Sequence, residues 1–138
     1  MLDAAVANLR VWLREVRVSS WHETAPVGVD EPQPDYLNGA ISGVTRHPPH
    51  SVLDALLGIE AALGRARPHR NAPRTIDLDL ILYDGVVVDE PGLSVPHPRF
   101  REREFVLVPL AEVAGDMIDP VTGLTVEALL NRLRARGA

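Results

Sequence analysis

The sequence predicts an α+β domain in which helices pack on an antiparallel sheet. Apolar residues at three- and four-residue spacing indicate helices, whereas residues 76–80 alternate apolar and acidic side chains as a strand does. The two patterns follow one another without the strict alternation typical of a parallel sheet, which favours the α+β class. A chain of 138 residues is long enough for one domain with its own core, so we expect residues 1–138 to form a single domain.

The first half of the chain is predicted to contain two helices and two strands. Leucine and valine at helical spacing predict an amphipathic helix over residues 2–16. Strands are expected at 18–22 and 36–44, with a proline-containing loop at 24–34. A second helix is expected from Ser51 to Leu63, since Ser51 and Asp54 can form a capping box and Gly64 can end the helix.

The second half is predicted to continue the sheet and then add a helix. A basic loop at 65–74 leads into a strand at 75–83, and Asp84-Gly85 predicts a two-residue hairpin turn into residues 86–88. Residues 89–103 carry three prolines and are expected to form a loop. Residues 105–113 fit a strand or a helix, and we favour a short helix near the end of this segment. Asp119 begins a turn, and Thr125 can cap a last helix that ends at Arg134.

Composition narrows the function. The net charge of −5 disfavours non-specific nucleic-acid binding, and no apolar run is long enough to span a membrane. Cysteine is absent, which fits a cytoplasmic protein without thiolate metal sites. Every basic residue is arginine, and seven of the 14 lie in the segments 65–74 and 99–103. Arginine suits bidentate phosphate contacts; the alternative is a compositional bias expressed in solvated loops.

Asp77 and Asp79 are the first candidate site. On a strand both carboxylates share one face, where they repel each other unless a cation lies between them. Magnesium prefers oxygen ligands and takes one or two carboxylates together with substrate phosphates. The spacing therefore suggests a magnesium site beside the arginines, with two solvent-facing aspartates as the alternative.

Three further groups accompany the two aspartates. A basic loop with Glu60 before it can close over phosphates; its arginines are Arg65, Arg67, Arg70 and Arg74. Tyr36, Asn38 and Phe105 suit a flat heterocycle with hydrogen-bonding edges, although ordinary core packing explains them as well. His97 lies in a proline-rich loop before the second group of arginines and could meet a phosphate or a nucleoside.

Several motifs in order resemble the 6-hydroxymethyl-7,8-dihydropterin pyrophosphokinases of folate biosynthesis. They run from about residue 19 to residue 109. The motifs are Thr24-Ala25-Pro26-Val27-Gly28, Gln33-Pro34-Asp35-Tyr36-Leu37-Asn38, Gly64-Arg65-x-Arg67, Ala72-Pro73-Arg74-Thr75-Ile76-Asp77-Leu78-Asp79-Leu80, Val95-Pro96-His97-Pro98 and Arg103-x-Phe105. The element Pro-Arg-Thr-x-Asp-x-Asp is highly specific.

The resemblance implies a ferredoxin-like sheet and a transfer of pyrophosphate from ATP to the pterin hydroxymethyl oxygen, with release of AMP. It implies that Asp77 and Asp79 ligate two magnesium ions. It assigns phosphate and nucleoside contacts to Arg65, Arg67, Arg74, His97, Arg103, Glu60, Leu80 and Ser94. It assigns the pterin to Tyr36 and Phe105 as stacking partners, with Asn38, Thr24 and the backbone near Val27 reading its edges.

The family's first strand, with its Gly-Ser-Asn-Leu-Gly type turn, has no counterpart before the helix that opens this sequence. Three explanations are open: a start assigned inside a longer protein, which we favour; a chain that folds as it stands with a rearranged or gapped sheet, which another copy could close; and a strand supplied by a separate chain or a removed fusion partner. We expect a monomer, with strand-completing self-association as the alternative.

Two other functions are compatible with the residues. The aspartates and arginines alone would permit a metal-dependent phosphohydrolase. Without the first strand, the chain could also be an inactive module that binds nucleotide or pterin. The expected partners are therefore ATP and a pterin, with neither nucleic acid nor membrane.

Overall fold

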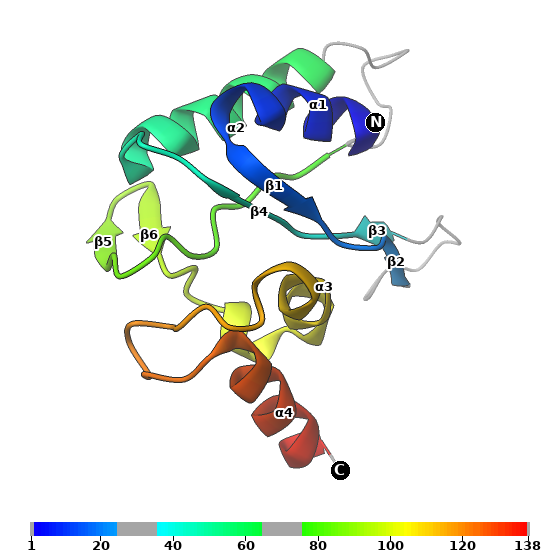
Figure 1. The fold of residues 1–138 in the computed structure, drawn as a ribbon, viewed down its shortest axis with the longest axis vertical. Helices are drawn as coiled ribbons and strands as arrows, with labels where there is room; N and C mark the ends of the chain where they lie inside the picture. Colours follow the sequence, from blue (N-terminus) through cyan, green and yellow to red (C-terminus); the bar gives the residue numbers. More distant parts are fainter. Residues whose placement is uncertain (1, 25–35, 65–75, 138) are drawn as a thin grey trace.

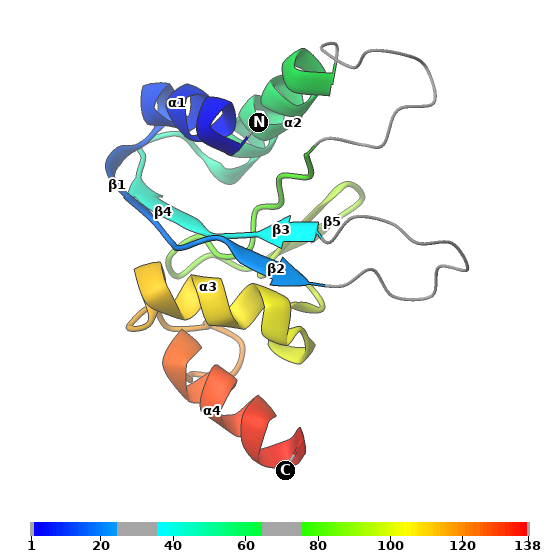
Figure 2. The same cartoon turned by 90° about the vertical axis from the view of Figure 1, so that its right-hand side faces the viewer.

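The computed structural model describes residues 2–24, 36–64 and 76–137, and these residues confirm the α+β class (Figures 1 and 2). The helices of this part are α1 (Leu2–Trp12), α2 (Pro49–Gly64), α3 (Glu104–Ala114) and α4 (Val126–Gly137), with a 3₁₀ helix η1 (Phe100–Glu102). The strands are β1 (Arg14–Val18), β2 (His22–Thr24), β3 (Tyr36–Asn38), β4 (Ile41–Val44), β5 (Val88–Glu90) and β6 (Leu93–Val95). None of the described helices is long and apolar enough to cross a membrane.

The strands form antiparallel pairs: β1 with β4, β2 with β3, and β5 with β6. The register of β1 shifts between Arg14 and Arg17, where Glu15 has a positive φ of 52°. Helices α1 and α2 cover one side of these strands, and α3 and α4 lie on the other (Figures 1 and 2). The strands are therefore the middle layer of the fold.

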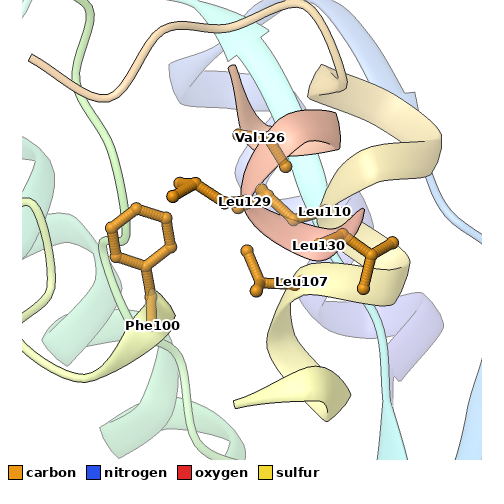
Figure 3. Packing of buried hydrophobic residues seen from close by; sticks show 6 residues of the cluster. All are labelled: Phe100, Leu107, Leu110, Val126, Leu129 and Leu130. Atoms are coloured by element: carbon orange, nitrogen blue, oxygen red, sulfur yellow. The ribbon is translucent and has the colours of Figure 1, made fainter. Parts of the chain in front are cut away.

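Each helical layer has its own apolar core. Leu9, Leu56 and Ile59 are buried between α1 and α2. The larger core lies between η1, α3 and α4 and is drawn in Figure 3; it consists of Phe100, Leu107, Leu110, Val126, Leu129 and Leu130. Residues 78–82 pass between the two cores: Leu78 and Leu80 pack against the first, and Ile81 and Leu82 pack against the second.

The N-terminal elements differ from the prediction. The helix predicted over 2–16 ends at Trp12, because the chain from Arg14 onward pairs with β4 instead. The strand predicted at 18–22 is split, since β1 ends at Val18 and β2 begins at His22. The strand predicted at 36–44 is interrupted between β3 and β4, where the ring of Trp21 lies against Gly39. Helix α2 begins two residues before Ser51, at Pro49, a residue that suits the first turn of a helix.

Two predictions for the second half of the chain are also corrected by the structure. Residues 76–80 alternate in burial, but residues 76–83 pair with no strand in the described part of the chain, so the predicted strand is not formed there. Asp84 and Gly85 do form a turn, in which the Val86 amide donates to the Tyr83 carbonyl at 2.9 Å. The hairpin lies further along: β5 and β6 pair across Pro91-Gly92, in a segment predicted to be a loop.

The C-terminal helices follow their sequence signals. Residues 104–114 form α3, which begins earlier than the helix predicted there. The Ala128 amide donates to the Thr125 hydroxyl at 3.1 Å, so the predicted cap of α4 is confirmed. The predicted loops at 25–34 and 65–74 lie outside the described residues.

A buried ion pair joins η1 to the turn before α4. Asp119 is fully buried and accepts hydrogen bonds from the Arg101 guanidinium, the Val121 amide and the Thr122 hydroxyl. Burial by itself raises the pKa of Asp119, but these hydrogen bonds outweigh it and lower the pKa to about 2. Because Arg101 lies two residues before Arg103, the pair fixes the start of α3.

This pair makes stability depend on pH. A carboxyl whose pKa is lowered from 3.8 to about 2 on folding stabilises the protein above pH 3.8, and the contribution is lost as the pH falls toward 2. The shift corresponds to about 2 kcal/mol. We expect the free energy of unfolding, measured by urea titration, to fall between pH 4 and pH 2, and to fall less steeply in Asp119→Asn.

The control is the pair between Glu104 and Arg134, whose side chains are 57% and 54% exposed. Exposed pairs contribute less than about 1 kcal/mol, so Glu104→Gln should leave the slope against pH nearly unchanged. Equal slopes in Asp119→Asn and the unsubstituted protein would contradict the assigned role of Asp119.

Gly39 is required by close packing. A Cβ at this position would lie 2.1 Å from the Trp21 ring, whereas a Cβ at Gly58 in α2 would contact nothing within 4 Å. We expect Gly39→Ala to displace Trp21 and to red-shift its fluorescence in a Trp12→Phe background. Gly58→Ala should leave the emission unchanged and stabilise the helix by about 0.5–1 kcal/mol. An unshifted spectrum in Gly39→Ala would show that the ring does not rest on Gly39.

Candidate active site

A cavity of about 1080 Å³ lies between the two helical layers. One wall is formed by consecutive residues of the β3–β4 segment, from Leu37 to Thr45, and the opposite wall by residues 77–84. Side chains of α1 and α2 close it on one side, and α3 closes it on the other, from Phe105 to Ala114. Six of the residues predicted from the sequence line this cavity: Asn38, Asp77, Asp79, Leu80, Arg103 and Phe105.

The two aspartates lie on a braced stretch of backbone. Asp77 and Asp79 are exposed, whereas Ile76 is buried and Leu78 and Leu80 are partly buried, as the alternation in the sequence predicts. The Leu78 amide, between the two, donates to the Glu60 carboxylate of α2 at 2.5 Å. Both carboxylates therefore reach the cavity from a peptide that is held by helix α2.

A second group of predicted residues comes from the β2–β3 pair and from the start of α3. The Asn38 side-chain amide donates to the Thr24 hydroxyl at 2.7 Å across the β2–β3 pair. Phe105 is 44% exposed, and the Arg103 guanidinium lies 5.7 Å from the centre of its ring. An amide, an open aromatic face and a guanidinium thus share the cavity with the two carboxylates.

Other predicted residues are not brought to the cavity wall. Ser94 lies in β6 opposite Asp89, and the His97 amide donates to the Ile81 carbonyl at 2.8 Å. Glu60 and Thr24 are not among the described lining residues. Glu60 is bonded to Leu78 and Thr24 is bonded to Asn38, and both of these partners line the cavity. The remaining predictions fall on Arg65, Arg67, Arg74 and Val27, which lie outside the described residues, as does the side chain of Tyr36.

The cavity also has lining residues that the sequence did not single out. Trp21, Leu37 and Asp116 contribute to the wall near Asn38 and α3. Trp21 has a signal in the sequence, since it is one of only two tryptophans. Asp116 has none, because an aspartate between helices is usually a solvent-exposed turn residue.

A second polar contact fixes α3 against the strands. Glu112 accepts hydrogen bonds from the Ser20 amide at 2.9 Å and from the Ser20 hydroxyl at 2.7 Å, and it contacts the His22 ring. These contacts, led by the backbone amide of Ser20, lower the pKa of Glu112 to about 2. Helix α3, which carries Phe105, is thereby tied to the segment that leads into β2.

The carboxylate oxygens of Asp77 and Asp79 are ligands of the type that magnesium prefers. In the described part of the chain no group of three or more acidic, histidine or cysteine side chains could hold a metal ion. Asp77 and Asp79 supply two neighbouring carboxylates on the cavity wall, and Mg²⁺ typically takes one or two carboxylates and completes its shell with water and substrate phosphates. The site therefore suits an ion that arrives with a phosphate ligand.

The sequence matches a family model described as 7,8-dihydro-6-hydroxymethylpterin-pyrophosphokinase (HPPK) over residues 1–115. The chain belongs to this family. The pyrophosphokinase predicted from the motifs, an enzyme of folate biosynthesis that uses ATP, is thereby confirmed at the level of the HPPK family.

Similar proteins bear names that agree with the family. The chain is 43% identical over 139 residues to a 2-amino-4-hydroxy-6-hydroxymethyldihydropteridine pyrophosphokinase of Methylorubrum extorquens, covering 99% of this chain and 86% of the relative. It is 40% identical over 134 residues to a protein of the same name in Synechocystis, covering 96% and 68%. A mitochondrial folate synthesis bifunctional protein of Arabidopsis thaliana is 43% identical over 103 residues, which are 75% of this chain and 18% of that protein.

The brace between α2 and the aspartate segment can be tested directly. Without an acceptor at position 60, the Leu78 amide loses its partner. We expect Glu60→Ala to speed hydrogen exchange of the Leu78 amide at least tenfold, as measured by NMR, and Glu60→Gln to restore part of the protection. Asp54→Ala, an exposed change in the same helix, should leave this amide unaffected. Equal exchange in Glu60→Ala and Asp54→Ala would disprove the brace.

Proposed function

We propose that this chain transfers pyrophosphate from ATP to the hydroxymethyl oxygen of 6-hydroxymethyl-7,8-dihydropterin. The observation that carries the proposal is that Asp77 and Asp79 share one cavity with Asn38 and Phe105, in a chain of the HPPK family. A phosphate-binding end and a heterocycle-binding end thus face the same space, as a transfer between two substrates requires.

Each end has a proposed set of residues. Asp77 and Asp79 would hold two magnesium ions, which when bound neutralise the charge of the ATP phosphates. Arg65, Arg67, Arg74, His97 and Arg103 would bind the phosphates, and Glu60, Leu80 and Ser94 would lie around the nucleoside. Tyr36 and Phe105 would stack on the pterin, while Asn38, Thr24 and the backbone near Val27 would read its edges.

The chemistry needs positioning more than a covalent nucleophile. The pterin oxygen attacks the β-phosphorus, the bond from that phosphorus to the α,β-bridging oxygen breaks, AMP leaves, and the hydroxyl proton passes to solvent. The exposed ring of Phe105 can hold the pterin plane. Arg103, beside that ring, can meet negative charge as it develops on the phosphate oxygens.

The finer predictions on the fold and its setting belong to the same proposal. A ferredoxin-like sheet would contain β1, β4 and residues 76–83 in one layer, within a single domain formed by residues 1–138. A monomer in the cytoplasm, with ATP and a pterin as its partners, remains the prediction from the sequence.

The aspartates provide the test. We expect Asp77→Ala and Asp79→Ala each to lower AMP formation from ATP and hydroxymethyldihydropterin by at least a hundredfold, because the phosphate charge is no longer neutralised. Asp89→Ala is the matched control, since Asp89 lies in β5 outside the cavity. Products would be separated by chromatography.

Each outcome of this assay separates the candidate functions. AMP and a pterin diphosphate in equal amounts support the transferase. Phosphate release without pterin would indicate a hydrolase instead. Saturable binding of a non-hydrolysable ATP analogue in calorimetry, without turnover, would leave the chain a binding module.

A further inference from the structure

Glu112 of α3 holds two residues of the segment that leads into β2. One of its carboxylate oxygens accepts hydrogen bonds from the Ser20 amide at 2.9 Å and from the Ser20 hydroxyl at 2.7 Å. The other oxygen lies 2.5 Å from Nε2 of His22. Because the bonds from Ser20 lower the pKa of Glu112 to about 2, the group is an ionised carboxylate near neutral pH and only accepts, so His22 donates from Nε2.

This contact lies on the face of the β2–β3 pair that carries the predicted hydrogen-bonding residues. His22 and Thr24 are two positions apart in β2, so their side chains point to one face. Asn38 lies opposite His22 in the register and its amide donates to the Thr24 hydroxyl, which places Asn38 on that face as well. Since His22 reaches Glu112, this face is turned toward α3, which packs against both strands (Figure 2).

Phe105 lies on the same side of α3 as Glu112. Seven residues separate the two, which is two helical turns, or about 10 Å along the axis. One end of this side of the helix is bonded to the strand that carries Thr24, and the other end presents the partly exposed Phe105 ring to the cavity. The contact of Glu112 therefore sets how far the Phe105 ring lies from Asn38.

The phosphate end of the cavity is held by a different contact. Asp77 and Asp79 flank Leu78, whose amide donates to Glu60 of α2. Helix α2 and helix α3 lie on opposite sides of the strands (Figures 1 and 2). Loss of the Glu112 contact would thus shift the heterocycle end of the site and leave the brace at the phosphate end in place.

We propose that Glu112 is a positioning residue for the heterocycle end of the site. By holding Ser20 and His22, it sets the spacing at which a flat heterocycle can stack on Phe105 and bond to Asn38 at the same time. Glu112 is not among the described residues that line the cavity, so it acts through these two residues. The inference rests on the function proposed above.

Steady-state kinetics of Glu112→Ala test the proposal. Without the carboxylate, Phe105 and Asn38 lose their fixed spacing, so we expect the KM for hydroxymethyldihydropterin to rise about tenfold. The KM for ATP should change by less than about twofold, because the phosphate end keeps its own brace. Glu112→Gln retains an oxygen that accepts from Ser20 and should restore most of the pterin affinity.

Two further variants control for a purely structural effect. Glu104→Ala removes another glutamate of α3, whose partner Arg134 lies in α4 and not in the strands, and it should change neither KM. His22→Ala removes one donor from the strand side and should raise the KM for the pterin alone, by a smaller factor, because the bonds from Ser20 remain. This variant tests the same contact where Glu112→Ala does not fold.

Two results would overturn the inference and leave the proposed function standing. An unchanged KM for the pterin in Glu112→Ala, or in His22→Ala where only that variant folds, means that the contact does not position the site. A rise of both KM values by the same factor means that the contact only stabilises the fold.

Calorimetry separates the inference from the proposed function. The pterin is titrated into the protein with Mg²⁺ and a non-hydrolysable ATP analogue present. In a protein without turnover, a Kd for the pterin that is about tenfold higher in Glu112→Ala would support the positioning role and refute the transferase. An equal Kd in both proteins would overturn the inference, and no pterin binding by the unsubstituted protein would overturn both.

Discussion

The backbone groups that border the strand layer need partners, and the arrangement of the molecule follows from how far this need is met. β4 pairs with β1 along one edge. Within residues 76–83, the Ile81 carbonyl accepts from the His97 amide and the Leu78 amide donates to Glu60. The facing edges border the cavity between the two apolar cores. Because buried backbone groups need hydrogen-bond partners, the bonds to β1, His97 and Glu60 fix where the two cavity walls lie.

The candidate site depends on the same layer. Asp77 and Asp79 lie at the start of the segment that lines one wall of the cavity, and Asn38 lies at the end of β3 in the opposite wall. Phe105 and Arg103 come from the other side, where the buried pair of Arg101 and Asp119 sets the entry to α3. Both halves of the site therefore take their positions from elements that meet at the middle layer.

The fold was predictable where a local signal matched the final partner. The Thr125 cap, the Asp84-Gly85 turn and the apolar α3 each depend on neighbours in sequence, and each is present. The boundary at Trp12 was not predictable, because Val16 continues the helical stripe and only pairing with β4 makes Arg14–Val18 a strand. The strand predicted at 75–83 shows the opposite case, since residues 76–80 alternate as expected but pair with no strand among the described residues.

The residues of the candidate site could be predicted where they belong to a sequence motif. Asp77, Asp79, Asn38 and Phe105 were found from their spacing and resemblance, and they share one cavity. The brace from Glu60 to the Leu78 amide was not foreseen, because it joins a helix to a backbone group and leaves no pattern in the sequence. The contact between Trp21 and Gly39 was missed for a similar reason: the rarity of tryptophan marks Trp21 in the sequence, but nothing there pairs it with Gly39.

The separation of the two cores has a consequence for cooperativity. The strand layer between the two cores is bonded to α3, since the Ser42 hydroxyl donates to the Val113 carbonyl and Glu112 accepts from Ser20. Where two apolar clusters lie on opposite sides of one strand layer, the bonds across that layer decide whether they open together. Loss of the bonds from Ser42 and Glu112 would let α3 separate from the strands before the α1–α2 core opens.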